Sequence, residues 1–296
     1  MKNRVLQTVG DGKFVETVYE LPDLATTDIR VKAVMTGVCR SDIDMMQGNF
    51  GPLPLSMQGH EGLGIVVDVG TDVDNIEIGD YVATRGEPAY ADYYNVRKDE
   101  YVKVPEADPK YILEPVACAL NIAFRMKTGS TLIIGSGFLS HVIAQYAATA
   151  PFNFAVDDVV GSSNVDLWNE IGIGLTTIMP EKKYDTVIVL NGTIDFDQAI
   201  DLCNDNAKLL LGCPLRDSTT NFERALWKNI TIECPSPRDP DFIDCMWEAG
   251  NRIEKGSIVV DKFWTAGYNR ETEWQEAFEE GLNRPQFYSR GYIYWL

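Results

Sequence analysis

Hydrophobic and polar residues alternate in short runs along the first 110 residues, and glycines interrupt these runs. Residues 29–35 alternate as a half-buried strand does, and residues 62–70 form a second such run. Residues 73–82 lead into a third strand through the turn at Gly79 and Asp80. Many short strands with glycine corners are typical of a small, partly open β-barrel, which we expect in this part of the chain.

The pattern becomes helical over residues 115–123, and beyond residue 131 apolar strands alternate with helices. Buried strands that alternate with helices predict a parallel sheet covered on both faces. From about Trp264 the tail returns to mixed strand and helix character. The expected strands are 131–135, 153–157, 176–179, 186–190, 208–214 and an edge strand at 230–234, and the expected helices are 138–149 and 195–203.

A glycine pair lies between the first of these strands and its helix, the context that a dinucleotide-binding fingerprint requires. Gly135 permits a tight turn, and Gly137 lets the backbone approach a pyrophosphate at the helix N-terminus. Asp157, with Asp158 beside it, stands at the predicted end of the next strand, where a carboxylate binds ribose and disfavours a 2′-phosphate. Ser140 replaces the third glycine, and an ordinary strand-to-helix turn is the alternative. We expect NAD(H) in preference to NADP(H).

A second group of candidate residues lies in the N-terminal part, where Cys39, Asp42, His60 and Glu61 fall within 23 residues and glycines flank them. Thiolate, imidazole and carboxylate are the ligands that zinc takes in proteins. Taken singly, the cysteine and histidine could be core residues and the acids a solvated face. Their combination favours a metal site. His141, the other histidine, falls in the first turn of the predicted helix and is interpreted as structural.

The segments Gly37-Val-Cys-Arg-Ser-Asp42 and Gly59-His60-Glu61 resemble those of the zinc-dependent medium-chain dehydrogenase/reductase family, the alcohol and polyol dehydrogenases. The resemblance implies an α/β chain with a GroES-like β-barrel catalytic domain at 1–120 and 264–296. It also implies a Rossmann nucleotide domain, a doubly wound parallel sheet, at 121–263. The implied activity is zinc-dependent hydride transfer between an alcohol or polyol, or its carbonyl product, and NAD(H).

The resemblance also implies a ligand set for one catalytic zinc ion. Cys39 and His60 supply two ligands, and Glu114 supplies the third from a Glu-Pro segment similar to that of polyol-type relatives. Cys118, one helical turn further on, is a less favoured alternative. Glu61 matches the glutamate beside the histidine, which lies close to the metal and can ligate it transiently. The four-cysteine lobe of many relatives is absent, so a second, structural zinc is not expected.

Further roles follow from the same resemblance. Asp42 would orient the zinc-binding histidine, and Ser41 would pass on the substrate proton. Asp44 stands where many relatives have a histidine that ends the proton relay. Arg40 and Arg290 match positions that contact the cofactor pyrophosphate. The remaining residues expected at the cofactor are Gly135, Gly137, Phe138 and Leu139 at the helix start, and Asn191, Gly212 and Cys213 at the nicotinamide.

Composition restricts the partners. The 296 residues include 26 basic and 44 acidic side chains, a net charge of −18, which argues against nucleic acid or an anionic membrane as the main partner. No apolar run reaches the ~18–20 residues that span a bilayer, and the six cysteines show no paired framework. We expect a cytoplasmic protein with a small-molecule substrate, forming a homodimer or homotetramer as relatives do.

Two other functions are compatible with the same fold. One is a zinc-free quinone or enoyl reductase that uses NADPH, although Cys39, His60 and Glu114 would then have no shared purpose. The other is a non-catalytic nucleotide-sensing protein, which the change at Asp44 and the shortened loops favour. Turnover of alcohols with NAD(H) separates both from the dehydrogenase.

Overall fold

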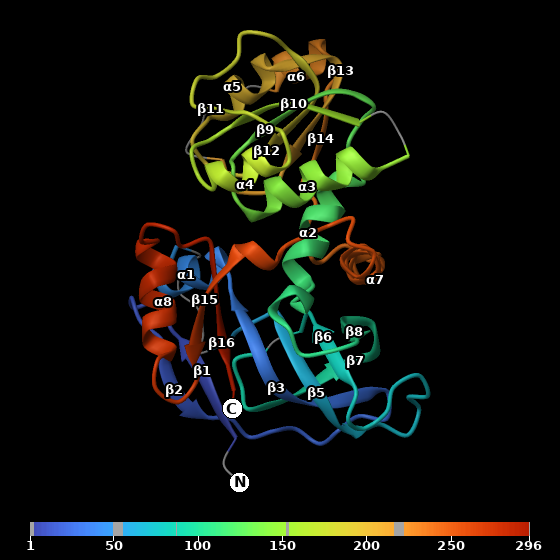
Figure 1. The fold of residues 1–296 in the computed structure, drawn as a ribbon, viewed down its shortest axis with the longest axis vertical. Helices are drawn as coiled ribbons and strands as arrows, with labels where there is room; N and C mark the ends of the chain where they lie inside the picture. The colour runs from blue at the N-terminus through green and yellow to red at the C-terminus, as the bar shows by residue number, and fades with distance from the viewer. Residues whose placement is uncertain (1–2, 50–55, 87, 152–153, 216–221, 296) are drawn as a thin grey trace. The chain divides into compact units, whose positions relative to one another are not determined.

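The computed structural model describes residues 3–49, 56–86, 88–151, 154–215 and 222–295. The chain divides into two compact units (Figure 1). The barrel unit comprises Met1–Pro115, Met246–Ile253 and Val260–Leu296, and the sheet unit comprises Val116–Cys245 and Glu254–Val259. The sequence predicted slightly different limits, with one domain at 1–120 and 264–296 and the other at 121–263. These domain limits stay a prediction.

The barrel unit is built on a seven-stranded sheet around β3 (Asp28–Val38). Alternate residues of β3, among them Ile29, Val31 and Ala33, are buried, as the alternating pattern predicts. The strand order is β15-β16-β3-β5-β6-β8, with β7 also paired to β3. The other strands of this sheet are β5 (Gly62–Val69), β6 (Tyr81–Thr84), β7 (Tyr93–Arg97), β8 (Tyr101–Val104), β15 (Trp264–Asn269) and β16 (Arg290–Tyr294).

A smaller sheet, β2-β1-β4, and two helices complete this unit. Phe14 and Phe278 stack with ring centroids 3.8 Å apart, and Tyr90 packs edge-on against both rings. This aromatic cluster joins the first strand, the last strand and both helices into one core. The elements are β1 (Arg4–Thr8), β2 (Val15–Val18), β4 (Ser56–Met57), α1 (Arg40–Met46) and α8 (Trp274–Asn283), with short 3₁₀ turns at Lys98–Glu100, Pro109–Tyr111 and Asp261–Phe263.

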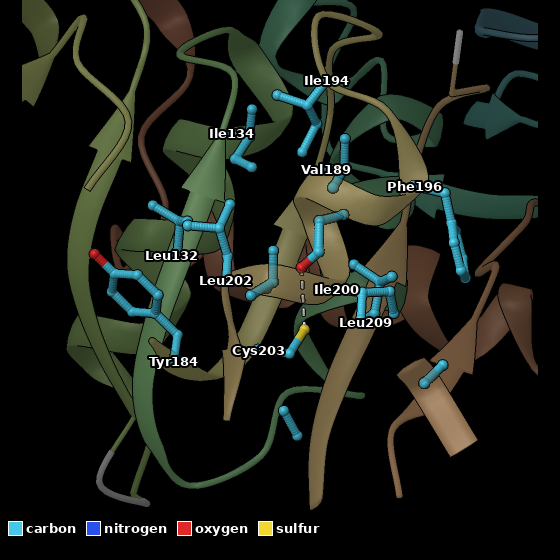
Figure 2. Close-up of a cluster of buried hydrophobic side chains, with 14 of the residues drawn as sticks. Leu132, Ile134, Tyr184, Val189, Ile194, Phe196, Ile200, Leu202, Cys203 and Leu209 are labelled. Atoms are coloured by element: carbon cyan, nitrogen blue, oxygen red, sulfur yellow. Dashed lines mark hydrogen bonds between the residues drawn. The ribbon is translucent and has the colours of Figure 1, made fainter. Parts of the chain in front are cut away.

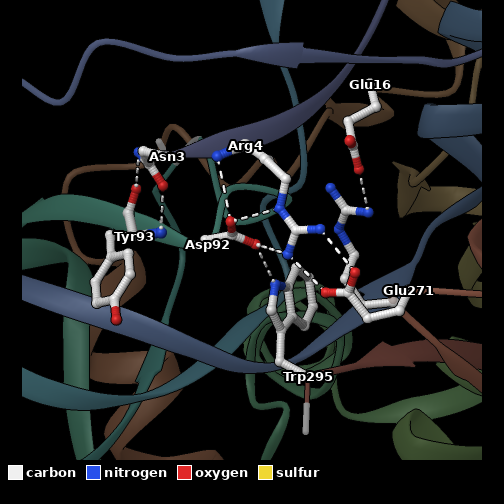
Figure 3. A network of polar contacts seen from close by, with 8 residues as sticks. Asn3, Arg4, Glu16, Asp92, Tyr93, Glu271 and Trp295 are labelled. Atoms are coloured by element: carbon white, nitrogen blue, oxygen red, sulfur yellow. Dashed lines mark hydrogen bonds and ion pairs between the residues drawn. The ribbon is translucent and has the colours of Figure 1, made fainter. Parts of the chain in front are cut away.

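A polar network attaches the N-terminal strand to the C-terminal segment (Figure 3). The Arg4 guanidinium bonds Asp92, at 3.0 Å from Nε, and Glu271, at 2.7 Å from Nη1. Trp295 donates from its indole to the same Asp92 at 3.1 Å. The C-terminal tail therefore returns to the first part of the chain within the barrel unit, as the resemblance implies.

The sheet unit contains a six-stranded parallel sheet in the order β11-β10-β9-β12-β13-β14. Counted within this sheet, the order is 3-2-1-4-5-6, the doubly wound arrangement of dinucleotide-binding domains. The Rossmann prediction is confirmed. The strands are β9 (Gly129–Ile134), β10 (Phe154–Val160), β11 (Leu175–Thr176), β12 (Tyr184–Val189), β13 (Cys203–Leu211) and β14 (Thr231–Glu233).

Figure 2 shows the core on which these strands pack. Leu132, Val187, Val189 and Leu209 have no exposed surface, so neighbouring strands bury an apolar layer. The helices of the unit are α3 (Phe138–Thr149), α4 (Val165–Glu170), α5 (Phe196–Asp201) and α6 (Glu223–Trp227). Two helices, α2 (Glu114–Ala123) and α7 (Phe242–Glu254), cross the limits of the units along the chain.

Candidate metal centre and nucleotide turn

Strand pairing in the barrel unit brings the two predicted metal-binding segments together. Cys39 follows directly on β3 as the N-cap of α1, and His60 and Glu61 precede β5. The two strands are antiparallel, with Thr36 opposite Gly62. The chain leaving β3 therefore passes beside the chain entering β5, although Cys39 and His60 are 21 positions apart in the sequence.

Three of the four residues predicted at the metal lie close together in one group. The Cys39 Sγ, a ring nitrogen of His60 and a carboxylate oxygen of Glu61 all lie within 4.8 Å of one another. Such spacing suits a single ion held by thiolate, imidazole and carboxylate, the ligands of zinc. Burial and the nearby Glu61 charge raise the pKa of the Cys39 thiol, so metal binding here would release a proton.

Asp42 and His60 lie close together behind this group. Asp42 is fully buried, and its Oδ1 lies 3.7 Å from His60 Nδ1. Its Oδ2 accepts hydrogen bonds from the Cys39 N–H at 2.9 Å and from the Tyr90 hydroxyl at 2.8 Å. Burial disfavours the charged ring, but Asp42, Cys39 and Glu114 together raise the pKa of His60 well above its ordinary value. Asp42 is thus placed to orient the imidazole.

Ser41 lies on the other side of the histidine ring. Its Oγ is 3.5 Å from His60 Nε2, at the upper limit of a hydrogen bond. Asp44, the residue at the relay position, instead accepts from Arg40 Nε and from Asn49 Nδ2, each at 3.1 Å. The phosphate role of Arg40 and the relay role of Asp44 stay predictions, and the two side chains pair with each other.

Arg290 reaches the metal group from the last strand. Its guanidinium bonds both carboxylate oxygens of Glu61, with Nη2 2.5 Å from Oε1. Glu61 is buried, at 1% exposure, and Arg290 is largely covered, at 12%. A Cβ on Gly37 would overlap this carboxylate, so a larger residue there would displace the Glu61 side chain. The sequence predicted Arg290 at the cofactor phosphates, and the structure places it on Glu61.

Glu114 is not one of the three residues that form this group in the described part of the chain. It begins α2, is 2% exposed, and its charge helps to raise the pKa of both His60 and Arg290. Its role as the third zinc ligand stays a prediction. Cys118 lies further along α2, in the sheet unit, and is not part of the group either.

The predicted nucleotide turn has the backbone that its sequence implies. Gly135 has φ +121°, a value that favours glycine, and a Cβ on Gly137 would meet no atom within 4 Å. The second glycine therefore faces open space, as a turn that admits a pyrophosphate must. Phe138 and Leu139 begin α3. The other predicted residues, Asn191 after β12 and Gly212 and Cys213 after β13, follow strands parallel to β9 and share its carboxyl-terminal edge.

Asp157 and Asp158 are not at the strand end where the sequence placed them. Strand β10 continues to Val160, with an irregularity between Val156 and Asp158. Asp157 accepts from the Thr131 N–H at 2.9 Å, and Asp158 bonds Lys182 and the Tyr184 hydroxyl, both at 2.7 Å. The predicted strand end was wrong, because the strand continues for two residues beyond the two acids, and their role at the cofactor stays a prediction.

The actual strand end carries Gly161-Ser162-Ser163-Asn164, which the sequence reasoning missed. Ser163 N–H donates to Ser136 Oγ at 2.8 Å, and the buried Trp168 indole donates to the Ser136 carbonyl at 3.0 Å. Ser136, between the two glycines, therefore fixes the loop after β10. Tyr90, which supports Asp42, was missed as well, since no local pattern marks it.

Comparison with known proteins agrees with this architecture. Residues 25–106 match the family model of the alcohol dehydrogenase GroES-like domain. Residues 25–106 therefore form a domain similar to the GroES-like domain of alcohol dehydrogenases. Among similar proteins, an alcohol dehydrogenase of Moraxella is 28% identical over 54% of the chain and 58% of its own length. An L-threonine 3-dehydrogenase of Aliivibrio fischeri is 23% identical over 73% of the chain and 78% of its own.

The same fold recurs in solved structures. An oxidoreductase/dehydrogenase of unknown specificity from Escherichia coli superposes with a TM-score of 0.81, at 18% identity and with both chains fully covered. The match to the Moraxella enzyme spans less than two thirds of that enzyme. In the described part of the chain, no helix is both long and apolar enough to cross a membrane.

Proposed function

We propose that this protein is a zinc-dependent oxidoreductase that transfers hydride between an alcohol or polyol, or its carbonyl product, and NAD(H). The observation that carries the proposal is the group of Cys39, His60 and Glu61, whose ligand atoms lie within 4.8 Å of one another. When bound, zinc would act as a Lewis acid that lowers the pKa of a hydroxyl, and the nicotinamide would accept or give hydride.

The ion would be held by Cys39, His60 and Glu114, which leaves one position for substrate. Glu61 is the less favoured permanent ligand because the Arg290 guanidinium already neutralises its carboxylate. It would instead balance charge beside the metal. A small change in the Glu61–Arg290 pair would let it ligate transiently.

The chain's own residues would handle the substrate proton. Asp42 holds the His60 ring from the Nδ1 side, which leaves Nε2 facing Ser41 and the group of ligands. The Ser41 hydroxyl would take the proton from a substrate alcohol and pass it toward solvent. In the reverse direction the same hydroxyl would return a proton to the carbonyl oxygen.

NAD(H) remains the better fit than NADP(H), on a ground other than Asp157. A 2′-phosphate is usually accommodated by a basic residue after the second strand. Here residues 161–164 include no lysine or arginine, and Asp166 follows in the first turn of α4. The 2′-phosphate of NADP(H) would meet the negative charge of Asp166 beside this loop.

A homodimer or homotetramer is proposed from the edge of the sheet unit. β14 ends the described sheet with one side unpaired by any described strand. The neighbouring helix α6 exposes Leu226 at 76% and Trp227 at 78%, an apolar surface suited to contact with a second copy. Sedimentation of the wild type and of Trp227→Ser would test this assembly.

The test of function is turnover of a panel of alcohols, polyols and their carbonyl products with NAD(H) and NADP(H). We expect NAD(H)-linked activity that Cys39→Ser abolishes. The matched control is Cys234→Ser, which changes an exposed cysteine and should leave activity intact. NADPH-linked quinone or enoyl reduction that survives Cys39→Ser would support the zinc-free reductase. Nucleotide binding without any turnover would support the sensor.

A further inference from the structure

The turn after β12 contains an asparagine followed by a glycine, Asn191-Gly192, a pair that occurs once in the sequence. Asparagine is among the chemically labile residues, because the backbone nitrogen of the next residue can attack its side-chain amide. Glycine hinders this attack least, since it has no Cβ. Both residues are half-buried, so water reaches them. The pair is therefore a candidate site of spontaneous covalent modification.

The Asn191 side chain is held in a geometry that favours this reaction. Its Oδ1 accepts hydrogen bonds from the Thr193 hydroxyl at 2.6 Å and from the Thr193 N–H at 3.4 Å. This arrangement folds the side-chain amide back over the Gly192 peptide. The two donors also stabilise the negative charge that develops on the amide oxygen during attack. Among the described residues no acceptor binds the Gly192 N–H, so the attacking nitrogen is free to react.

The same turn lies against the predicted nucleotide turn, within the sheet unit. The Leu190 N–H donates to the Ile134 carbonyl at 2.8 Å, and a Cβ on Gly135 would lie 3.6 Å from the Asn191 nitrogen. The two turns are neighbours because β9 and β12 pair in parallel and end at the same edge of the sheet. A charge created on Asn191 would therefore act on a group bound at the glycine turn.

We infer that Asn191-Gly192 is a self-modifying site whose products carry a negative charge and weaken dinucleotide binding. The Gly192 nitrogen forms a bond to the Asn191 Cγ while the Cγ–Nδ2 bond breaks, and the proton of that nitrogen leaves with the amide as ammonia. Water then opens the cyclic imide at either carbonyl, which leaves aspartate or isoaspartate at position 191. No electrons are transferred, and water is the only co-reactant.

The new carboxylate would change the nucleotide turn in two ways. Its negative charge would repel the pyrophosphate that the turn is expected to bind. The isoaspartate form would also add a methylene group to the main chain after β12 and displace the turn. This effect rests on the proposed function, because it requires that the turn binds a dinucleotide. We expect the dinucleotide affinity to fall about threefold to tenfold at low salt, and less at high salt.

The first experiment follows the modification by peptide-mapping mass spectrometry while the folded protein is incubated at mildly alkaline pH. The Asn191 peptide should lose the mass of ammonia and then gain that of water. The exposed Asn229, which Ile230 follows, is the internal control and should stay intact. Thr193→Val should slow the reaction about threefold, and Gly192→Ala should slow it further. An intact Asn191 peptide, or equal rates in Thr193→Val and wild type, would overturn the inference.

The second experiment measures NADH affinity by fluorescence, for fresh and for incubated protein. Incubated wild type and fresh Asn191→Asp should each bind about threefold to tenfold more weakly than fresh wild type. Incubated Gly192→Ala should bind as its own fresh form does. Unchanged affinity in wild type whose Asn191 is largely modified would overturn the effect on binding. Fresh protein that binds no NADH would instead refute the proposed function, and the mass measurement would still decide whether Asn191 is modified.

Discussion

The buried pair of Glu61 and Arg290 offers a quantitative test of the metal centre. The two side chains are 1% and 12% exposed, and one guanidinium nitrogen contacts both carboxylate oxygens. Replacing one partner leaves the other as an uncompensated buried charge, which costs about 3–5 kcal/mol. We therefore expect Glu61→Gln and Arg290→Gln each to lose stability in this range, and the double variant to lose much less than the sum.

The assay is urea unfolding of the four proteins with chelator present, so that metal binding does not contribute. The predicted coupling energy between the two sites is about 2–3 kcal/mol, near the upper end for residues in contact. Glu271→Gln is the control, since its pair with Arg4 is 55% and 32% exposed and should contribute less than about 1 kcal/mol. Additive effects of Glu61→Gln and Arg290→Gln, each below 1 kcal/mol, would refute the reasoning.

Three further predictions concern single side chains. Gly37→Ala should destabilise the barrel unit by about 1–3 kcal/mol in chemical unfolding, because the new methyl group overlaps the Glu61 carboxylate. Ser136→Ala should cost about 1 kcal/mol and raise the Kd for NADH measured by fluorescence, because a backbone N–H of the following loop loses its acceptor. Hydrogen bonding, first from the Ser130 N–H, lowers the pKa of Asp185 below its ordinary value of 3.8. The ionised carboxylate therefore stabilises the fold above pH 3.8, and this contribution is lost as the pH falls through the lowered pKa. The urea midpoint of Asp185→Asn should therefore lie below that of wild type at pH 7, and the difference should shrink at pH 3.

The fold was predictable because its signals are local. Alternation over residues 29–35 and 62–70 predicted β3 and β5, and glycine spacing after an apolar strand predicted the turn at Gly135. The parallel sheet followed from strands alternating with helices, and its order 3-2-1-4-5-6 agrees with the Rossmann prediction.

The site was less predictable because its contacts connect distant residues. Arg290 lies 229 positions from Glu61, and no local pattern indicates that they pair. Tyr90 supports Asp42 across 48 positions for the same reason. The position of Asp157 was misjudged because the end of β10 was predicted too early. The apolar residues that extend β10 to Val160 follow the two acids.

Zinc content is the most direct test of the central claim that Cys39 and His60 hold a catalytic metal. Protein purified without chelator, and offered zinc, should contain about one zinc ion per chain by mass spectrometry. Cys39→Ser should retain almost none while remaining folded, and Cys234→Ser should match the wild type. Folded wild-type protein that takes up no zinc would contradict the account.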